Sequence, residues 1–364
     1  MTTGPYFSID RMAEYVGDVS ESEPAAWPSF EHGLAAMPAC RWDEAIGHFE
    51  TAQTKVAGKD FAPLLNQVGV CHYMQGRLGD ALKGFQESAR LAEQHEDKQG
   101  KTSALNNIGV TLHEYGELNL SLKNLMEARA SARASGNQAA EALCLGNIGN
   151  VLRDKGEHNA ALKSHEDALA MSRRIGDEQG VASSQVNIGG ILRDKGESGK
   201  ALERYAEAVE TARGIAYKLG VAIGLCNIGS LYRDKGELDR ALKSHESALA
   251  LAHEIGYRLG VATELGNIGL ILTSKRMHER AVSYLAESLS FFLAAGAANG
   301  PRQALYGLSK CDDWLGRERT RGLLERAGLT DERIADTLDR IDQIRSRRPW
   351  QMGKHRHPFA PVGR

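Results

Sequence analysis

Large aromatic side chains, paired cysteines and long apolar segments are all scarce in this sequence. Aromatic residues make up 6% of the 364 residues, which disfavours a core built on large rings and suits contacts between small side chains. The cysteines are scattered without a CxxC pair, so they indicate reduced thiols rather than a zinc site or a disulfide framework. We therefore predict a cytoplasmic protein with no cofactor and no metal ion.

Membrane and secretion signals are absent as well. The longest apolar stretch, SFFLAAGAA at residues 290–298, is too short to span a bilayer. The N-terminus lacks the basic segment followed by an apolar run that marks a signal peptide. The sequence thus predicts no membrane partner.

Neither sign of charge dominates the chain. With 45 Lys and Arg against 47 Asp and Glu, the net charge of −2 disfavours nucleic acid as a partner. The exception is the segment 345–364, which holds six Arg or Lys, no acid, and the aromatic Trp350 and Phe359. Such a segment could bind single-stranded nucleic acid with strong salt dependence, could fold back onto its own chain, or could have no role.

Motifs that carry catalysis are missing. The sequence has no GxGxxG after a strand and no GxxxxGK[ST], HExxH or GxSxG. Cys71 and His72 are adjacent, but neighbours on a helix point apart and do not pair as a nucleophile and its base. His165 and His245 recur 80 residues apart in KSHE, and we expect packed, hydrogen-bonded side chains there. The chain is predicted not to be an enzyme.

What the sequence does have is a repeat with a fixed period. A glycine recurs after 36 residues once and after 40 residues from then on. These glycines are Gly33, Gly69, Gly109, Gly149, Gly189, Gly229 and Gly269. A small Ala or Ser follows each glycine after 12 residues, and another follows after seven more. Small residues at fixed places predict close contact between helices in seven successive repeats.

Each repeat is predicted to contain two helices. The first, helix A, carries a pattern such as LGNIGNVLRDK and ends at a glycine such as Gly156, a typical C-terminal signal. The second, helix B, carries AALKSHEDALAMSRRIG, with Leu162, His165 and Leu169 at helical spacing. Because one pair of helices cannot bury both apolar faces, neighbouring pairs must stack into a superhelix.

This pattern resembles the tetratricopeptide repeat (TPR), and the 40-residue period with LGNIGN and KGEHNAALKSHEDAL is similar to the Pins/LGN type. The resemblance implies an all-α fold, a right-handed superhelical solenoid of helix-turn-helix repeats with helical caps. We predict an acidic N-terminal segment at 1–25, seven repeats at 26–295, a degenerate repeat and capping helix at 296–348 with Thr330 as N-cap, and a basic disordered tail at 349–364. TSKRM at 273–277 replaces RDKGE, so we expect the glycine turn to be lost there.

Three polar residues recur unchanged in NIGNVLRDKGE (147–157), NIGGILRDKGE (187–197) and NIGSLYRDKGE (227–237). In the first copy Asn147, Asn150, Arg153 and Asp154 are spaced to lie along one face of helix A. Stacked repeats would continue this face as ladders of Asn107, Asn147, Asn187, Asn227 and Asn267, of Arg153, Arg193 and Arg233, and of Asp154, Asp194 and Asp234. An Asn amide both donates and accepts, so it can pair with a peptide unit of any sequence.

In TPRs of the Pins/LGN type the matching Asn lines the peptide groove, so the resemblance implies that these Asn residues clamp the backbone of an extended peptide. The Arg residues at the groove edge would pair with a carboxylate of the ligand. Two alternatives stay open, because each Asn can tie helix A to its neighbour and each Arg can pair with Asp of the next repeat.

The predicted function is a non-enzymatic scaffold whose concave TPR groove binds an extended peptide or a disordered segment of a partner protein. A ligand-gated or peptide-gated regulator acting on a separate effector is the alternative, and nucleic-acid binding through the basic tail is another. An apolar patch at Phe291 and Phe292 leaves a homodimer open.

Overall fold

The described part of the chain is helical throughout. The computed structural model describes residues 25–37, 41–56, 61–294 and 301–346, and these residues contain no strand. The helices are α2 (Trp27–Ala36), α3 (Trp42–Gln53), α4 (Phe61–Met74), α5 (Leu78–Gln94), α6 (Lys98–Glu114), α7 (Leu118–Ala134), α8 (Gln138–Asp154), α9 (His158–Ile175), α10 (Glu178–Asp194), α11 (Ser198–Gly214), α12 (Lys218–Asp234), α13 (Leu238–Glu254), α14 (Arg258–Ser274), α15 (His278–Ala294), α16 (Pro301–Leu315), α17 (Arg317–Arg326) and α18 (Asp331–Ser346).

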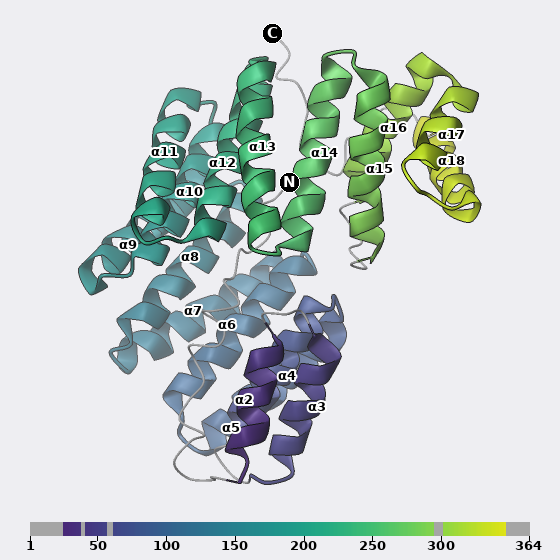
Figure 1. Cartoon of the computed structure of the whole chain (residues 1–364). Helices are drawn as coiled ribbons and strands as arrows, with labels where there is room; N and C mark the ends of the chain where they lie inside the picture. The colour runs from purple at the N-terminus through teal and green to yellow at the C-terminus, as the bar shows by residue number, and fades with distance from the viewer. Residues whose placement is uncertain (1–24, 38–40, 57–60, 295–300, 347–364) are drawn as a thin grey trace. The chain divides into compact units, whose positions relative to one another are not determined.

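Consecutive helices pack side by side as pairs, for example α14 with α15 (Figure 1). The even-numbered helices from α2 to α14 are helices A, and each is followed by its helix B. Helices A also touch one another, as α6 does α8 and as α12 does α14. The all-α tandem arrangement predicted from the period is therefore confirmed.

The predicted glycine turns close helix A as expected. After α8, Gly156 has a φ of 81°, its N–H donates to the carbonyl of Arg153, and the N–H of Glu157 donates to the carbonyl of Leu152. These two bonds form a Schellman motif, which uses a residue in the left-handed region to satisfy the last carbonyls of a helix. Glycine occupies this place because it has no Cβ to clash there.

The same turn persists where its glycine is missing, so the expected loss at TSKRM is wrong. Arg276 has a φ of 61° after α14, and its N–H donates to the carbonyl of Thr273. The N–H of Met277 donates to the carbonyl of Leu272, which completes the motif. The backbone bonds and the packing of α14 on α15 hold Arg276 in a conformation that its own side chain disfavours.

The repeating glycine makes room for a large residue of helix B. A Cβ added to Gly149 would lie 2.5 Å from Nε2 of His165, far inside normal contact. In five other repeats the added Cβ would lie within 2.8 Å of the facing side chain. These pairs are Gly33 with Phe49, Gly69 with Phe85, Gly109 with Leu125, Gly229 with His245 and Gly269 with Leu285. The small residues on helix B serve the same approach, because the Ser121 hydroxyl donates to the carbonyl of Gly109 at 2.6 Å. Close helix contact is confirmed.

The chain divides into two compact units, and the division falls inside α10. The N-terminal unit is Met1–Ile191 and the C-terminal unit is Leu192–Arg364. The core of the N-terminal unit includes Phe30, Phe49, Leu64 and Phe85, all fully buried. That of the C-terminal unit is aliphatic, with Ile268, Leu272, Val282, Leu285 and Leu308.

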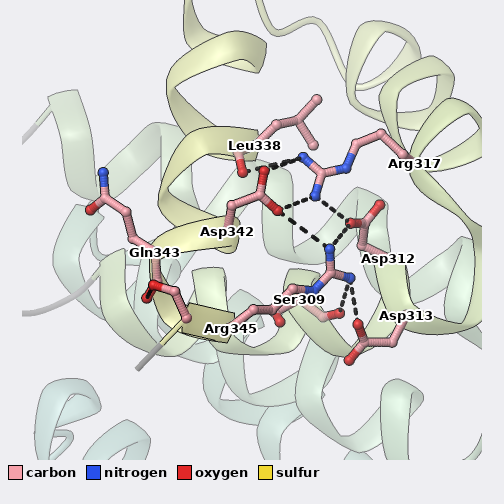
Figure 2. A network of polar contacts seen from close by, with 9 residues as sticks. Ser309, Asp312, Asp313, Arg317, Leu338, Asp342, Gln343 and Arg345 are labelled. Carbon is pink, nitrogen blue, oxygen red and sulfur yellow. Dashed lines mark hydrogen bonds and ion pairs between the residues drawn. The ribbon is translucent and has the colours of Figure 1, made fainter. Parts of the chain in front are cut away.

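The last three helices of the C-terminal unit are joined by an ionic network. Asp312 on α16 is fully buried, and its Oδ2 lies 2.8 Å from Nη1 of Arg345 on α18 and 3.1 Å from Nη2 of Arg317 on α17. Figure 2 shows both guanidinium groups converging on this carboxylate. The Thr330 hydroxyl accepts from the N–H of Arg333 at 3.4 Å, which confirms it as the N-cap of α18.

Several sequence expectations fall outside this description. The N-terminal segment 1–25 lies almost wholly outside the described residues, and the tail 349–364 does so entirely, so both assignments stay predictions.

Phe292 is 3% exposed and packs inside its own chain, and the half-buried Phe291 lies under the guanidinium of Arg258. The two rings therefore do not form an apolar surface patch, and the homodimer, which the open helix ends also suggested, stays a prediction.

Candidate functional site

The polar residues predicted to form ladders all lie on helices A. Asn107 is on α6, Asn147, Asn150, Arg153 and Asp154 are on α8, Asn187, Arg193 and Asp194 are on α10, Asn227, Arg233 and Asp234 are on α12, and Asn267 is on α14. Asn150 is half-buried, and each of the three Asp residues is exposed at the last helical position. The helical period thus places these residues as the spacing predicts, but their contacts differ from repeat to repeat.

In the N-terminal unit two ladder Asn residues connect successive helices A. Nδ2 of Asn107 donates to Oδ1 of Asn66 on α4 at 3.0 Å. Nδ2 of Asn147 donates to Oδ1 of Asn106 on α6 at 2.8 Å. All four side chains are buried. These amides have the geometry of the structural alternative, and contact with a ligand at Asn107 and Asn147 stays a prediction.

Asn267 makes a related connection in the C-terminal unit. Its Nδ2 lies 3.8 Å from Sγ of Cys226 on α12, and its Oδ1 accepts from Nε2 of Gln303 at 2.9 Å. Nη1 of Arg233 also donates to this oxygen at 3.3 Å. In each Asn connection the acceptor lies 41 residues earlier in the chain. Sequence reasoning missed this partner position, although the period marks it as the residue just before the ladder.

Asn187 and Asn227 differ because the partner position is apolar in their repeats. Forty-one residues before them lie Gly146 and Val186, which carry no side-chain acceptor. Nδ2 of Asn227 instead donates to the carbonyl of Ile223 on its own helix at 2.9 Å. Asn187 is half-buried. These two amides are therefore not committed to a cross-repeat amide pair.

The Asp and Arg ladders also vary. In the N-terminal unit Asp154 accepts from the imidazole of His113 on α6, with 2.8 Å between Oδ2 and Nε2. The guanidinium of Arg153 reaches across to α10, where a Cβ added to Gly190 would lie 3.0 Å from its Nη1. The sequence showed His113 at the Arg place of its repeat but did not show that it would pair with Asp154.

Arg193 lies close enough to Arg233 in the C-terminal unit for its charge to act on that guanidinium. Burial lowers the pKa of Arg233, the Asp234 carboxylate raises it, and the charge of Arg193 makes a smaller contribution that lowers it. Nη2 of Arg233 lies 3.6 Å from Oδ1 of Asp234, and its side chain is 12% exposed. A partly dry guanidinium with a second positive charge near it favours a bound anion. This part of the helix-A face is thus suited to a carboxylate.

Two of the described thiols are poorly suited to nucleophilic catalysis. Burial raises the pKa of the Cys71 thiol to about 12 and that of the Cys144 thiol to about 12, so both stay protonated near neutral pH. One group of residues in the described part of the chain could hold a metal ion, namely Cys226, His245 and Glu264. None of the helices described is both long enough and apolar enough to cross a membrane.

The expectation of packed, hydrogen-bonded histidines is confirmed for His245 and wrong in part for His165. His165 and His245 are fully buried, as expected. Nδ1 of His245 is hydrogen-bonded to Glu264, but neither ring nitrogen of His165 has a hydrogen-bond partner among the described residues. The residue 19 positions after His165 is Ser184, where the equivalent residue after His245 is Glu264, and this difference removes the partner.

The fold and the repeated helix-A face define an all-α tandem-repeat protein of the TPR-like solenoid class. Residues 138–214 and 220–294 match the tetratricopeptide repeat family. The first segment spans α8 to α11, and the second spans most of α12 together with α13 to α15. The Pins/LGN subtype stays a prediction. No curated protein matches the chain.

Solved structures with the same fold cover most of the chain. A Rap protein complexed with Competence and Sporulation Factor has a TM-score of 0.65 and 15% identity over 92% of each chain. NprR in complex with its cognate peptide NprX has a TM-score of 0.55 and 17% identity, over 90% of this chain and 98% of that one. A signal transduction ATPase with numerous domains (STAND) and a TPR sensor, from Pyrococcus horikoshii, has a TM-score of 0.57 and 15% identity, over 93% of this chain and 52% of that one. At these identities the similarity shows the fold.

Proposed function

We propose that this chain is a non-enzymatic interaction protein whose helix-A face binds an extended peptide carrying a carboxylate. The carboxylate pairs with Arg193 and Arg233 in the C-terminal unit. The amide of Asn227 in the same unit pairs with the peptide backbone, because it is not committed to a cross-repeat amide pair. Asn267 supports this surface through its bonds within the chain, whereas Asn107 and Asn147 connect helices A of the N-terminal unit.

The observation that carries the proposal is that Arg193 lies near Arg233, whose side chain is 12% exposed. They occupy the same place in successive helices A, and the charge of one lowers the pKa of the other. A ligand carboxylate between them would offset this repulsion and accept charge-assisted hydrogen bonds from planar guanidinium groups. The same pairing is weaker for a neutral ligand, so the surface selects for an anion.

The repeat spacing suits an extended backbone. Packed helices lie about 10 Å apart, and an extended chain rises about 3.3 Å per residue. A peptide that crosses successive helices A therefore meets one Asn roughly every third residue. Because an amide group can both donate to and accept from a peptide unit, this contact places no demand on the peptide side chains.

The similar structures support a peptide as the ligand class. Two of them are named with a bound factor or peptide, Competence and Sporulation Factor in Rap and NprX in NprR. Both share the helical fold over 90% or more of this chain. The sequence identity is too low to infer the ligand of this chain from these structures. The ligand therefore has to be identified by peptide selection.

The test is a peptide selection followed by binding measurements. The full chain is used to select ligands from a randomised peptide library, and affinities are measured by fluorescence anisotropy. Selected peptides are expected to share an Asp, a Glu or a free C-terminal carboxylate. Arg193→Ala and Arg233→Ala should each weaken binding by roughly 10- to 100-fold, the range expected for a charged hydrogen bond.

A matched control is available on helices B. Arg204 is half-buried and Arg240 is exposed, and they pair with Glu207 and Glu237 respectively. Arg204→Ala with Arg240→Ala changes the net charge as much as the double Ala variant at Arg193 and Arg233. Equal losses in the two double variants would mean that binding follows overall charge, and the proposal would be wrong.

A second candidate is a peptide-gated regulator of a separate effector. The STAND protein carries its TPR region as a sensor, and it shares the fold of this chain. If this chain also acts as a sensor, adding the selected peptide should change the amount of effector protein that the chain captures. The extract used would come from the cells that produce this chain. Capture that is unaffected by the peptide would favour the scaffold over the regulator.

A further inference from the structure

We propose that Cys226, His245 and Glu264 form a binding site for a divalent transition-metal ion such as Zn²⁺. The three residues come from α12, α13 and α14 of the C-terminal unit. One ligand atom from each residue lies within 4.8 Å of the other two. The closest pair is Nδ1 of His245 and Oε2 of Glu264, at 2.6 Å.

This geometry lies near that of a zinc site. Zinc binds sulfur at about 2.3 Å and nitrogen or carboxylate oxygen at about 2.0–2.2 Å, with tetrahedral angles. Ligand atoms in such a site are therefore roughly 3.3 to 3.6 Å apart. The His245–Glu264 pair would open by about 0.7 Å as the ion replaces the hydrogen bond, and small side-chain rotations can supply that change. Three protein ligands leave the fourth position for a solvent molecule.

The balance of charge also favours an ion. The side chains of His245 and Glu264 are 0% and 6% exposed, so a carboxylate is held away from water with one imidazole beside it. Buried carboxylates of this kind are paired or coordinate a metal. A thiolate, a carboxylate and a neutral imidazole around a divalent cation are neutral overall. Binding is an acid–base step in which the Cys226 thiol loses its proton to solvent and its sulfur donates an electron pair to the ion.

The residues around the site leave one ligand open to solvent and place a hydrogen-bond donor beside it. Cys226 is partly exposed, whereas the other two ligands are buried. Nδ2 of Asn267 points to the sulfur at 3.8 Å, and Gln303 holds the opposite end of that amide at 2.9 Å. A hydrogen-bond donor beside a metal thiolate orients it and stabilises its charge. The soft sulfur together with imidazole selects transition metals of the zinc class over Mg²⁺ or Ca²⁺.

The combination occurs in one repeat. At the equivalent places 40 residues earlier the chain has Val186, Tyr205 and Gly224, and 80 residues earlier it has Gly146, His165 and Ser184. Thus the His165 repeat keeps the imidazole, and the glycine that faces it, without the thiol or the carboxylate. His165 is therefore a built-in control for the metal site.

The test uses the full chain after treatment with a chelator. Titration with Co²⁺ should produce a thiolate-to-cobalt charge-transfer band and the visible bands of a four-coordinate ion, with an end point at one equivalent. Zn²⁺ should abolish both. Cys226→Val and His245→Leu should each lower the Co²⁺ affinity by more than about 100-fold, because even outer-shell changes cost 10- to 100-fold. His165→Leu should leave the titration unchanged.

Valine and leucine already occur at these positions in other repeats. Val186 is equivalent to Cys226, and Leu125 is equivalent to His245. A second measurement needs no variant. Alkylation of Cys226 in the wild-type chain, mapped by mass spectrometry, should slow on addition of Zn²⁺, while the buried Cys71 and Cys144 should not change. The absence of a thiolate band in the wild type, a band that survives Cys226→Val, or alkylation of Cys226 that ignores Zn²⁺ would overturn the proposal.

Discussion

Replacing His165 with leucine should stabilise the protein, and the gain should grow as the pH falls. The imidazole is fully buried, and neither of its nitrogens has a hydrogen-bond partner among the described residues. A buried polar group without a partner costs about 1–3 kcal/mol, and leucine removes that cost. Leu125 and Leu285 occupy the same place in other repeats and face the equivalent glycines, so a leucine side chain fits the site.

The pH dependence follows from the pKa of the histidine. Burial lowers the pKa of His165 from 6.5 to about 3, and the charge of Arg153 adds to this effect. Below pH 6.5 the unfolded chain binds a proton at this residue and the folded chain does not. Stability is therefore lost as the pH falls from 6.5 towards 3, by about 1.4 kcal/mol for each pH unit. Between pH 7 and pH 5 the loss from His165 is about 2 kcal/mol.

The assay is urea unfolding of wild type and His165→Leu, followed by circular dichroism at pH 7 and at pH 5. The advantage of the variant should widen by about 2 kcal/mol at the lower pH. Because the two chains share every other titrating group, their difference isolates this histidine. The same advantage at both pH values, or a variant less stable than wild type, would refute the reasoning. His245→Leu should behave oppositely at pH 7, because it leaves the Glu264 carboxylate buried without its imidazole partner.

Three further predictions concern local features. Ala216 has a φ of 55° at the place where Gly256 has 68°, so Ala216→Gly should raise the free energy of unfolding in urea by about 1 kcal/mol. Asp312→Ala removes the acceptor shared by two Arg residues and should cost about 2–3 kcal/mol, seen as a lower melting temperature. Asn147→Ala should cost about 1 kcal/mol in urea because a buried amide bond is lost, whereas Asn187→Ala should shift the urea midpoint little.

Each of these predictions has a contrast within the chain. Gly256→Ala should destabilise by about as much as Ala216→Gly stabilises, since an added Cβ at Gly256 meets no neighbour and only the backbone conformation matters. Arg326→Ala on α17 serves as the surface control for the ionic network. If Asn187→Ala proves as costly as Asn147→Ala, then Asn187 also has a structural role, and the contrast between the two amides would be wrong.

The fold could be predicted from the sequence because its determinants are local and periodic. The glycine represented by Gly149 recurs in each repeat with a large residue 16 positions later. Gly156 marks the end of the helix A that contains Gly149. Both signals depend on a missing Cβ, which allows close helix contact in one case and a positive φ in the other. Repetition over seven helix pairs made each signal visible above the variation between repeats.

The candidate site was predictable in position but not in contacts. Helical spacing correctly placed Asn147 and Arg153 on helix A. Whether a ladder amide bonds to a neighbouring helix A depends on the residue 41 positions earlier, and that residue differs between repeats. The Cys226 cluster was missed for the same reason, since its three residues lie on three helices and carry no motif of their own.

The sequence by itself determined the repeat length, the order of helices and the places where helices approach closely, because each follows from side-chain volume and backbone freedom within one repeat. The tertiary structure decided what the polar residues do. It bonded Asn147 to Asn106, left His165 without a partner and brought Cys226 together with Glu264. The physical reason is that hydrogen bonds and ion pairs act over a few ångströms, so their partners are set by how successive helices stack rather than by the period that builds them.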